Sequence, residues 1–121
     1  MDKISVNMDN ILNARFGKDL STITATFKKT VKIREYETEV IEVSSTTQID
    51  ENASGIERML ATSLLTGQIE YAAYVALAAN GLMPEKELKA RCSNIEKDIN
   101  LVVNKYIALT GEDPSGKYNL V

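Results

Sequence analysis

The chain has 121 residues, a length that suits one domain with one hydrophobic core, so residues 1–121 are expected to form a single domain. Its 17 acidic and 14 basic residues give a net charge of −3 at pH 7, whereas proteins that neutralise many phosphates usually carry a basic surface. Histidine is absent and cysteine occurs once, as Cys92, which excludes His-dependent triads, thiolate zinc clusters and an intramolecular disulfide.

The first 48 residues favour β-structure. Residues 3–8 alternate apolar and polar side chains, which predicts a half-buried strand, and one helical turn is expected at residues 9–14. A turn is expected at residues 17–19. Residues 20–48 are rich in Val, Ile and Thr, with a bend expected near residues 28–30. Together these segments predict an N-terminal antiparallel sheet of three to four strands.

The second half of the chain predicts helices at residues 52–66, 68–80 and 84–109. Gly67 separates the first two helices, and Asn80 with Gly81 ends the second. The last helix begins after Pro84 and is the longest, and a flexible tail is expected at residues 111–121. The predicted fold class is therefore α+β, with the sheet first and two to three helices after it.

A regular apolar seam runs along the predicted last helix. Its members are spaced alternately four and three residues apart: Leu88, Cys92, Ile95, Ile99, Val102, Tyr106 and Leu109. The seam packs either on the chain's own sheet and preceding helix or on a second subunit. A helix of roughly 26 residues is about 39 Å long at 1.5 Å per residue, which is longer than a domain of this size easily covers.

Residues 71–79 are apolar on every side, and a helix that is apolar all round is expected to be buried all round. Two interpretations account for this: a central helix between the sheet and the last helix, or a helix that a second copy of the chain covers. The second interpretation predicts a homo-oligomer. Its predicted interface residues are Ala72, Ala76, Ile95, Ile99, Val102 and Tyr106.

Basic and acidic side chains follow one another in the predicted sheet. Four cations precede four carboxylates: Lys28, Lys29, Lys32, Arg34, then Glu35, Glu37, Glu39 and Glu42. Such a run usually forms the solvated face of a hairpin and protects its edges. The alternatives are a basic patch for phosphates and a carboxylate cluster for a metal or for acid–base chemistry.

Four aromatic and cationic residues are the candidate ligand-binding groups. Arg58, Tyr71, Tyr74 and Arg91 are the kinds of side chain that hold a nucleotide-like ligand by stacking and phosphate pairing. We predict no catalytic residue, no cofactor and no metal site, because the glycines form neither a Walker loop nor a dinucleotide fingerprint. The N-terminus lacks a signal-peptide core and no segment spans a bilayer, so a cytoplasmic protein without a membrane partner is expected.

The order of elements resembles that of small accessory proteins of phages and prophages of low-GC bacteria. A sheet followed by helices that end in a long one is similar in layout to the anti-Thoeris signal sponges, although no residue motif matches. The resemblance implies an oligomer that sequesters cyclic ADP-ribose-type signals from TIR-domain enzymes without degrading them. The alternatives are a protein-binding inhibitor or adaptor, and an accessory nucleic-acid-binding protein that uses the basic run.

Overall fold

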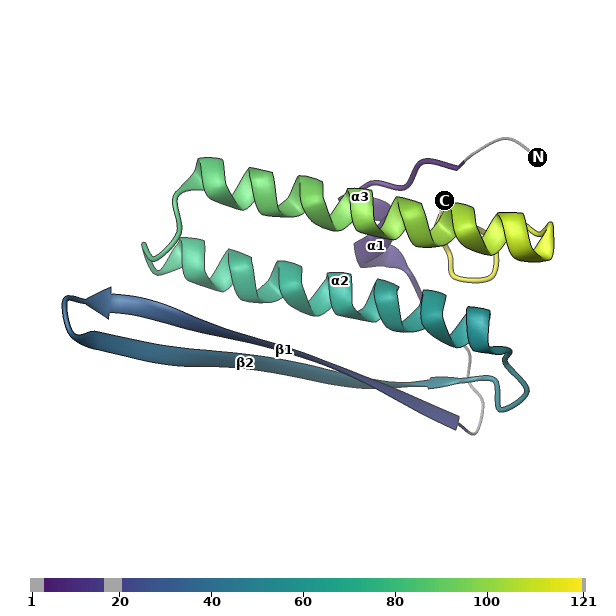
Figure 1. Cartoon of the computed structure of the whole chain (residues 1–121), viewed down its shortest axis with the longest axis horizontal. Helices are drawn as coiled ribbons and strands as arrows, with labels where there is room; N and C mark the ends of the chain where they lie inside the picture. Colours follow the sequence, from purple (N-terminus) through teal and green to yellow (C-terminus); the bar gives the residue numbers. More distant parts are fainter. Residues whose placement is uncertain (1–3, 17–20, 121) are drawn as a thin grey trace.

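The computed structural model describes residues 4–16 and 21–120. In chain order the elements are α1 (Met8–Asn13), β1 (Ser21–Arg34), β2 (Glu37–Ile49), α2 (Gly55–Ala79) and α3 (Glu85–Thr110). The strands form a long hairpin along α2, and α3 lies beyond α2 (Figure 1). The α+β class and the long last helix are confirmed, but the described residues contain two strands and not three or four.

The hairpin is continuous where the sequence predicted a bend. Residues 28–30 stay paired with residues 40–42, and the chain reverses at Glu35 and Tyr36 instead. Tyr36 adopts a φ of 73°, a left-handed conformation that favours Gly or Asn. No residue type marked the turn, so the prediction placed it wrongly. The turn predicted at residues 17–19 lies outside the described residues.

The predicted strand at residues 3–8 is wrong, although its burial pattern is right. Residues 4–7 form an extended arm, in which Val6 is buried and Ser5 and Asn7 are exposed, and α1 begins at Met8. Among the described residues the arm pairs with no strand. Its backbone instead meets side chains that are one helical turn apart on α3: Glu96, Asn100 and Asn104.

Two of these side chains each bond both backbone groups, the N–H and the C=O, of one residue of the arm. The side-chain amide of Asn100 accepts from the Val6 N–H at 2.7 Å and donates to the Val6 carbonyl at 3.1 Å. Asn104 makes the same pair of bonds with Ile4, at 3.2 and 3.3 Å. Side chains of a helix can therefore form the backbone hydrogen bonds of an extended segment that has no neighbouring strand. The alternation of apolar and polar residues in the sequence does not reveal whether the segment pairs with a strand or with a helix.

One continuous helix, α2, replaces the two that were predicted at residues 52–66 and 68–80. Gly67 stands inside it, where a Cβ would lie 2.7 Å from the Ile99 side chain and 3.1 Å from that of Ile95. The glycine therefore permits close approach of α3 and does not break the helix. The predicted end is confirmed, because Asn80 is the C-cap and Gly81 has a φ of 73°.

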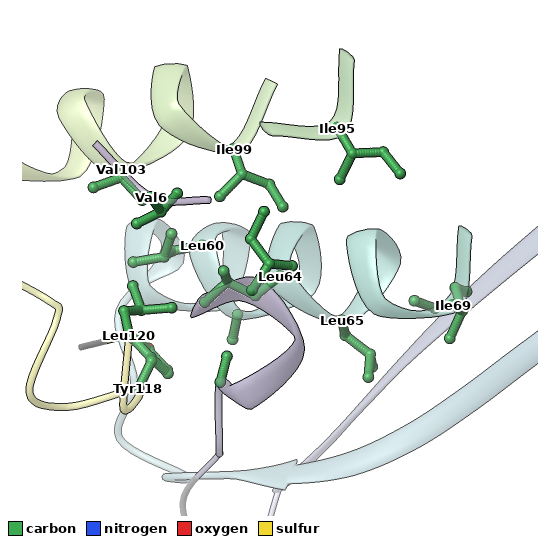
Figure 2. Close-up of a cluster of buried hydrophobic side chains, with 14 of the residues drawn as sticks. Val6, Leu60, Leu64, Leu65, Ile69, Ile95, Ile99, Val103, Tyr118 and Leu120 are labelled. Carbon is green, nitrogen blue, oxygen red and sulfur yellow. The ribbon is translucent and has the colours of Figure 1, made fainter. Parts of the chain in front are cut away.

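The core lies where α2 meets α1, α3, the tail and the inner face of the hairpin. Figure 2 shows Val6, Leu60, Leu64, Ile99 and Val103 gathered between α2 and α3. The tail predicted to be flexible enters the same core through Tyr118 and Leu120, which are each 1% exposed. The Tyr118 carbonyl accepts from the Arg15 N–H at 2.8 Å, which ties the tail to the segment after α1.

The expectation that residues 71–79 are buried all round is wrong. The hairpin and α3 cover Ala73, Tyr74 and Leu77, but one side of the helix is open. The exposed residues there share one helical face: Ala72, Val75, Ala76 and Ala79. We call them the alanine face. It continues the side of α2 on which Gln68 donates to the carbonyls of Ile11 and Ala14, so α1 covers this side earlier in the helix and stops short of residues 71–79.

Candidate functional site

A groove of about 180 Å³ lies between α2 and α3. Its polar lining is formed by Thr62, Ser63, Thr66, Glu70 and Asp98. Its apolar lining is formed by Gly67, Ile95, Ile99 and Val102. Polar groups that converge around an apolar surface are the usual form of a small-molecule site, although most such sites enclose more than about 300 Å³. The groove therefore suits a small ligand or one part of a larger ligand.

Helical spacing brings the polar groups together. Thr62, Thr66 and Glu70 are four residues apart and so line one side of α2. The Thr66 hydroxyl donates to the Thr62 carbonyl at 2.8 Å, so its oxygen can act only as an acceptor toward a ligand. Asp98 completes the lining from α3. These groups offer mostly hydrogen-bond acceptors and negative charge.

The surroundings of Glu70 shift its pKa. Burial raises the pKa of Glu70, the negative charge of Asp98 raises it further, and Arg91 lowers it. Arg91 also forms an ion pair with Glu87, at 3.3 Å between Nη2 and Oε1, so its charge is shared with a second carboxylate. The groove thus holds two carboxylates, and the Arg91 cation beside them is shared with Glu87, which favours a positively charged ligand over a free phosphate.

Two of the predicted ligand residues, Tyr74 and Arg91, do come together at the Glu70 end of the groove. The Arg91 guanidinium lies 5.7 Å from the centre of the Tyr74 ring, within the range of a cation–π contact. The other side of this contact is closed, because Phe27 packs edge-on against Tyr74 with ring centroids 5.3 Å apart. Tyr74 is 5% exposed, so its ring packs in the core and its faces are not open to a stacked base.

Arg58 does not join this pair. It lies 16 residues before Tyr74 on α2, about 24 Å along the helix axis. Its guanidinium donates to the carbonyls of Ala53 and Glu51, where it holds the loop before α2. Tyr71 is half-buried on α2 and does not line the groove. The four predicted residues therefore form one pair and two separate positions.

The predicted interface residues also divide into two groups. Ile95, Ile99 and Tyr106 are buried within the chain's own core, and Val102 is half-buried beside the groove. The predicted seam drifts round α3, so Leu109 at its end is 65% exposed while Val103 and Ile107 are buried. Ala72 and Ala76 belong to the alanine face and stay open to a partner.

Cys92 is a free, half-buried cysteine on α3. Burial raises the pKa of the Cys92 thiol, as does Glu96, so this cysteine is less ionised than a free one.

Within residues 4–16 and 21–120, no three His, Cys, Asp or Glu side chains are grouped so as to hold a metal ion. In the same part of the chain no helix is long and apolar enough to cross a bilayer.

Comparison of the chain with protein families, with curated proteins and with solved structures finds no significant match. The site is therefore interpreted from its own geometry. The sequence analysis missed the groove residues Thr62, Thr66, Glu70 and Asp98. The signal that was available is the spacing of Thr62, Thr66 and Glu70, a polar line along an otherwise apolar helix.

Proposed function

We propose that the chain is a non-catalytic, homo-oligomeric binding protein that holds a small amine-bearing molecule in the groove between α2 and α3. The observation that carries this proposal is the convergence of Glu70, Asp98 and three hydroxyl side chains on an apolar surface. An ammonium group offers donors and a positive charge to these acceptors. The small volume favours compact ligands such as a diamine or an amino sugar.

A nucleotide-derived signal, as the resemblance to the anti-Thoeris sponges implies, is the second ligand class. Arg91 is the observation that favours it, since a guanidinium beside the groove can pair with a phosphate. Two facts weigh against it: Glu87 already pairs with Arg91, and the groove is too small for a whole nucleotide. Such a ligand would insert one part and leave the rest on the surface.

The inhibitor or adaptor and the nucleic-acid binder find less support. Two of the four basic residues of β1 lie beside carboxylates of β2, with Lys28 opposite Glu42 and Arg34 paired with Glu37 at 3.8 Å. This weakens the basic patch that a phosphate backbone would need. A protein-binding role remains compatible with the open hairpin edges, and a tight protein partner in place of a small ligand would favour it.

The proposal is tested by thermal unfolding of the full chain with five separate probes at pH 7.5: putrescine, spermidine, glucosamine, glucose and adenosine monophosphate. A saturating amine is expected to raise Tm, since a ligand at 100 times its Kd stabilises the folded state by about 2.7 kcal/mol. Asp98→Asn should abolish the shift, whereas Glu85→Gln, which removes an exposed charge from the same helix, should keep it. A shift with adenosine monophosphate alone would transfer the proposal to the second ligand class.

Two results would contradict the proposal directly. Equal shifts in the Asp98→Asn and wild-type chains would place amine binding outside the groove. Conversion of the bound molecule into a product would show that the groove is catalytic, with Glu70, whose pKa burial raises, and the neighbouring Asp98 as the groups able to move a proton. Product analysis by mass spectrometry after prolonged incubation separates binding from turnover.

A further inference from the structure

The two strands of the hairpin carry opposite charges. Strand β1 contains four cations and no carboxylate: Lys28, Lys29, Lys32 and Arg34. Strand β2 contains three carboxylates and no cation: Glu37, Glu39 and Glu42. In the hairpin register Lys28 stands opposite Glu42, so the charges attract one another within the chain.

Both outer edges of the hairpin lack a strand partner among the described residues, because the sheet order is β1-β2. The strands are 14 and 13 residues long, and each outer edge presents a row of unpaired backbone donors and acceptors. The half of the hairpin away from the turn, residues 21–27 and 43–49, contains no charged residue and no proline. A strand edge that carries no charged residue and no proline readily accepts another strand.

We propose that copies of this chain assemble edge to edge, with β1 of one copy adding to β2 of the next. The inference rests on the homo-oligomeric part of the proposed function and names its interface. Repeating the antiparallel register of the hairpin between chains sets Lys28 of one copy opposite Glu42 of its neighbour. Pairing two β1 or two β2 edges gains no such attraction. The contact is heterologous, so it forms a ring or a continuous sheet.

The spacing of the layers fits this arrangement. Two strands occupy about 10 Å across a sheet, so neighbouring copies place their α2 helices about 10 Å apart. Packed helices lie about 8–10 Å apart, and the lower values require small side chains at the contact. The alanine face supplies such side chains on the open side of α2. The neighbouring copy thereby covers the apolar surface that one chain leaves exposed.

Sheet twist explains why this contact falls in the second half of α2. Adjacent strands rotate by about 20–25°, so two strands turn the neighbouring α2 by about 40–50°. Crossing near 50° is the commonest helix packing, and it brings two helices together over a short stretch while their ends diverge. α1 occupies the same side of α2 before residue 71, in the stretch where the helices diverge.

Sedimentation velocity of the full chain over a range of concentrations tests the interface. Glu39→Lys with Glu42→Lys makes both outer edges cationic, and it should raise the dissociation constant at least tenfold. The matched control, Glu85→Lys in the first turn of α3 with Glu112→Lys just after its C-cap, makes the same change of charge away from the hairpin and should leave assembly unchanged. Adding Lys28→Glu and Lys32→Glu to the first variant restores opposite charges and should restore assembly.

The outcomes separate the interface from the proposed function. If the wild-type chain is a monomer at every concentration, both the inference and the oligomeric part of the proposed function fail. If it is an oligomer that the Glu39→Lys, Glu42→Lys chain retains in full, the interface is wrong and the oligomer stands. Circular dichroism of each variant confirms that the hairpin is folded, so loss of assembly is not loss of structure.

Discussion

The two halves of α2 differ in a way that composition does not predict. The first half contains polar residues at several positions, yet Leu60, Ala61 and Leu64 are completely buried. The second half, residues 71–79, contains no charged residue, yet one whole side of it is exposed. Burial therefore follows from how many neighbouring elements reach each turn of the helix, and not from how apolar that turn is.

The covering elements explain this difference. α1, α3, the hairpin and the tail all meet the first half, and Lys117 of the tail pairs with Glu57 at its start. The second half meets the hairpin and α3. Alanine loses little by exposure because its side chain has little apolar area, so the open side costs the monomer little. The small side chains also let a second copy approach this side closely.

The largest effect is expected from shortening a side chain in the first half. Leu64→Ala removes a completely buried side chain and should lower the free energy of unfolding by about 2–5 kcal/mol. Val75→Ala, in the second half, removes one that is 37% exposed and should change stability by less than about 1 kcal/mol. Urea unfolding at low protein concentration compares them, and equal losses would contradict the difference between the halves.

The arm that helps cover the first half gives the next largest effect. Asn100→Ala removes both hydrogen bonds to Val6 and leaves buried peptide groups unpaired, which should cost about 1–3 kcal/mol. Asn94→Ala is the control, because Asn94 is exposed on the same helix. Hydrogen exchange should show loss of protection at Val6 in the first variant. Unchanged protection would mean that the side-chain amide does not hold the arm.

Gly67 stands at the boundary between the two halves and allows a matched pair of glycine substitutions. Gly67→Ala places a Cβ against Ile99 and Ile95 and should destabilise by about 1–2 kcal/mol, despite the better helix propensity of alanine. Gly55→Ala meets no atom within 4 Å and should be neutral or stabilising. Thermal unfolding of both variants tests this. Stabilisation by both would show that the helices have room to separate.

Glu70 gives a smaller effect whose sign is set by pH. Its folded-state pKa lies above the value of 4.5 that is usual for an unfolded chain, so the folded state holds its proton to higher pH. Stability from this group is complete below pH 4.5 and is lost as pH rises through the folded pKa. Glu70→Gln should therefore stabilise at pH 7, by at most about 1 kcal/mol because the site is partly solvated. A variant that is less stable at pH 7 would contradict this sign.

The smallest effect on stability is expected from Ala76→Arg on the alanine face. The side chain is exposed, so the monomer should keep its stability within about 0.5 kcal/mol. Assembly should fail, because a bulky charge stands where the neighbouring copy packs. Unfolding at low concentration and sedimentation at high concentration measure the two effects. A destabilised monomer would show that this side of the helix is covered from within the chain.

Much of the architecture was predictable because local signals and tertiary packing agree. The end of α2 at Asn80 and the long helix after Pro84 follow from capping residues. Spacing of four residues on a helix favours ion pairs, and α3 forms two of them, at 3.5 Å for Glu85 with Lys89 and 3.3 Å for Glu87 with Arg91.

The errors arose where packing decides against the local signal. Tyr36 lies in the turn of the hairpin with a positive φ, a conformation that its residue type does not indicate. Gly67 allows α3 to approach α2 closely and does not end the helix. The pair of Tyr74 and Arg91 was predicted as part of a site, but Phe27 fills the space beside it. The groove itself depends on which sides of α2 and α3 meet, and the seam predicted for α3 was shifted by part of a turn.

The central claim is that the groove between α2 and α3 binds a small amine, and titration calorimetry of the full chain with putrescine at pH 7.5 tests it most directly. Binding should be saturable and should weaken as pH falls, because Glu70 then gains a proton. It should disappear in Asp98→Asn but not in Glu85→Gln. Absence of binding by the wild-type chain, or equal binding by the Asp98→Asn chain, would contradict it.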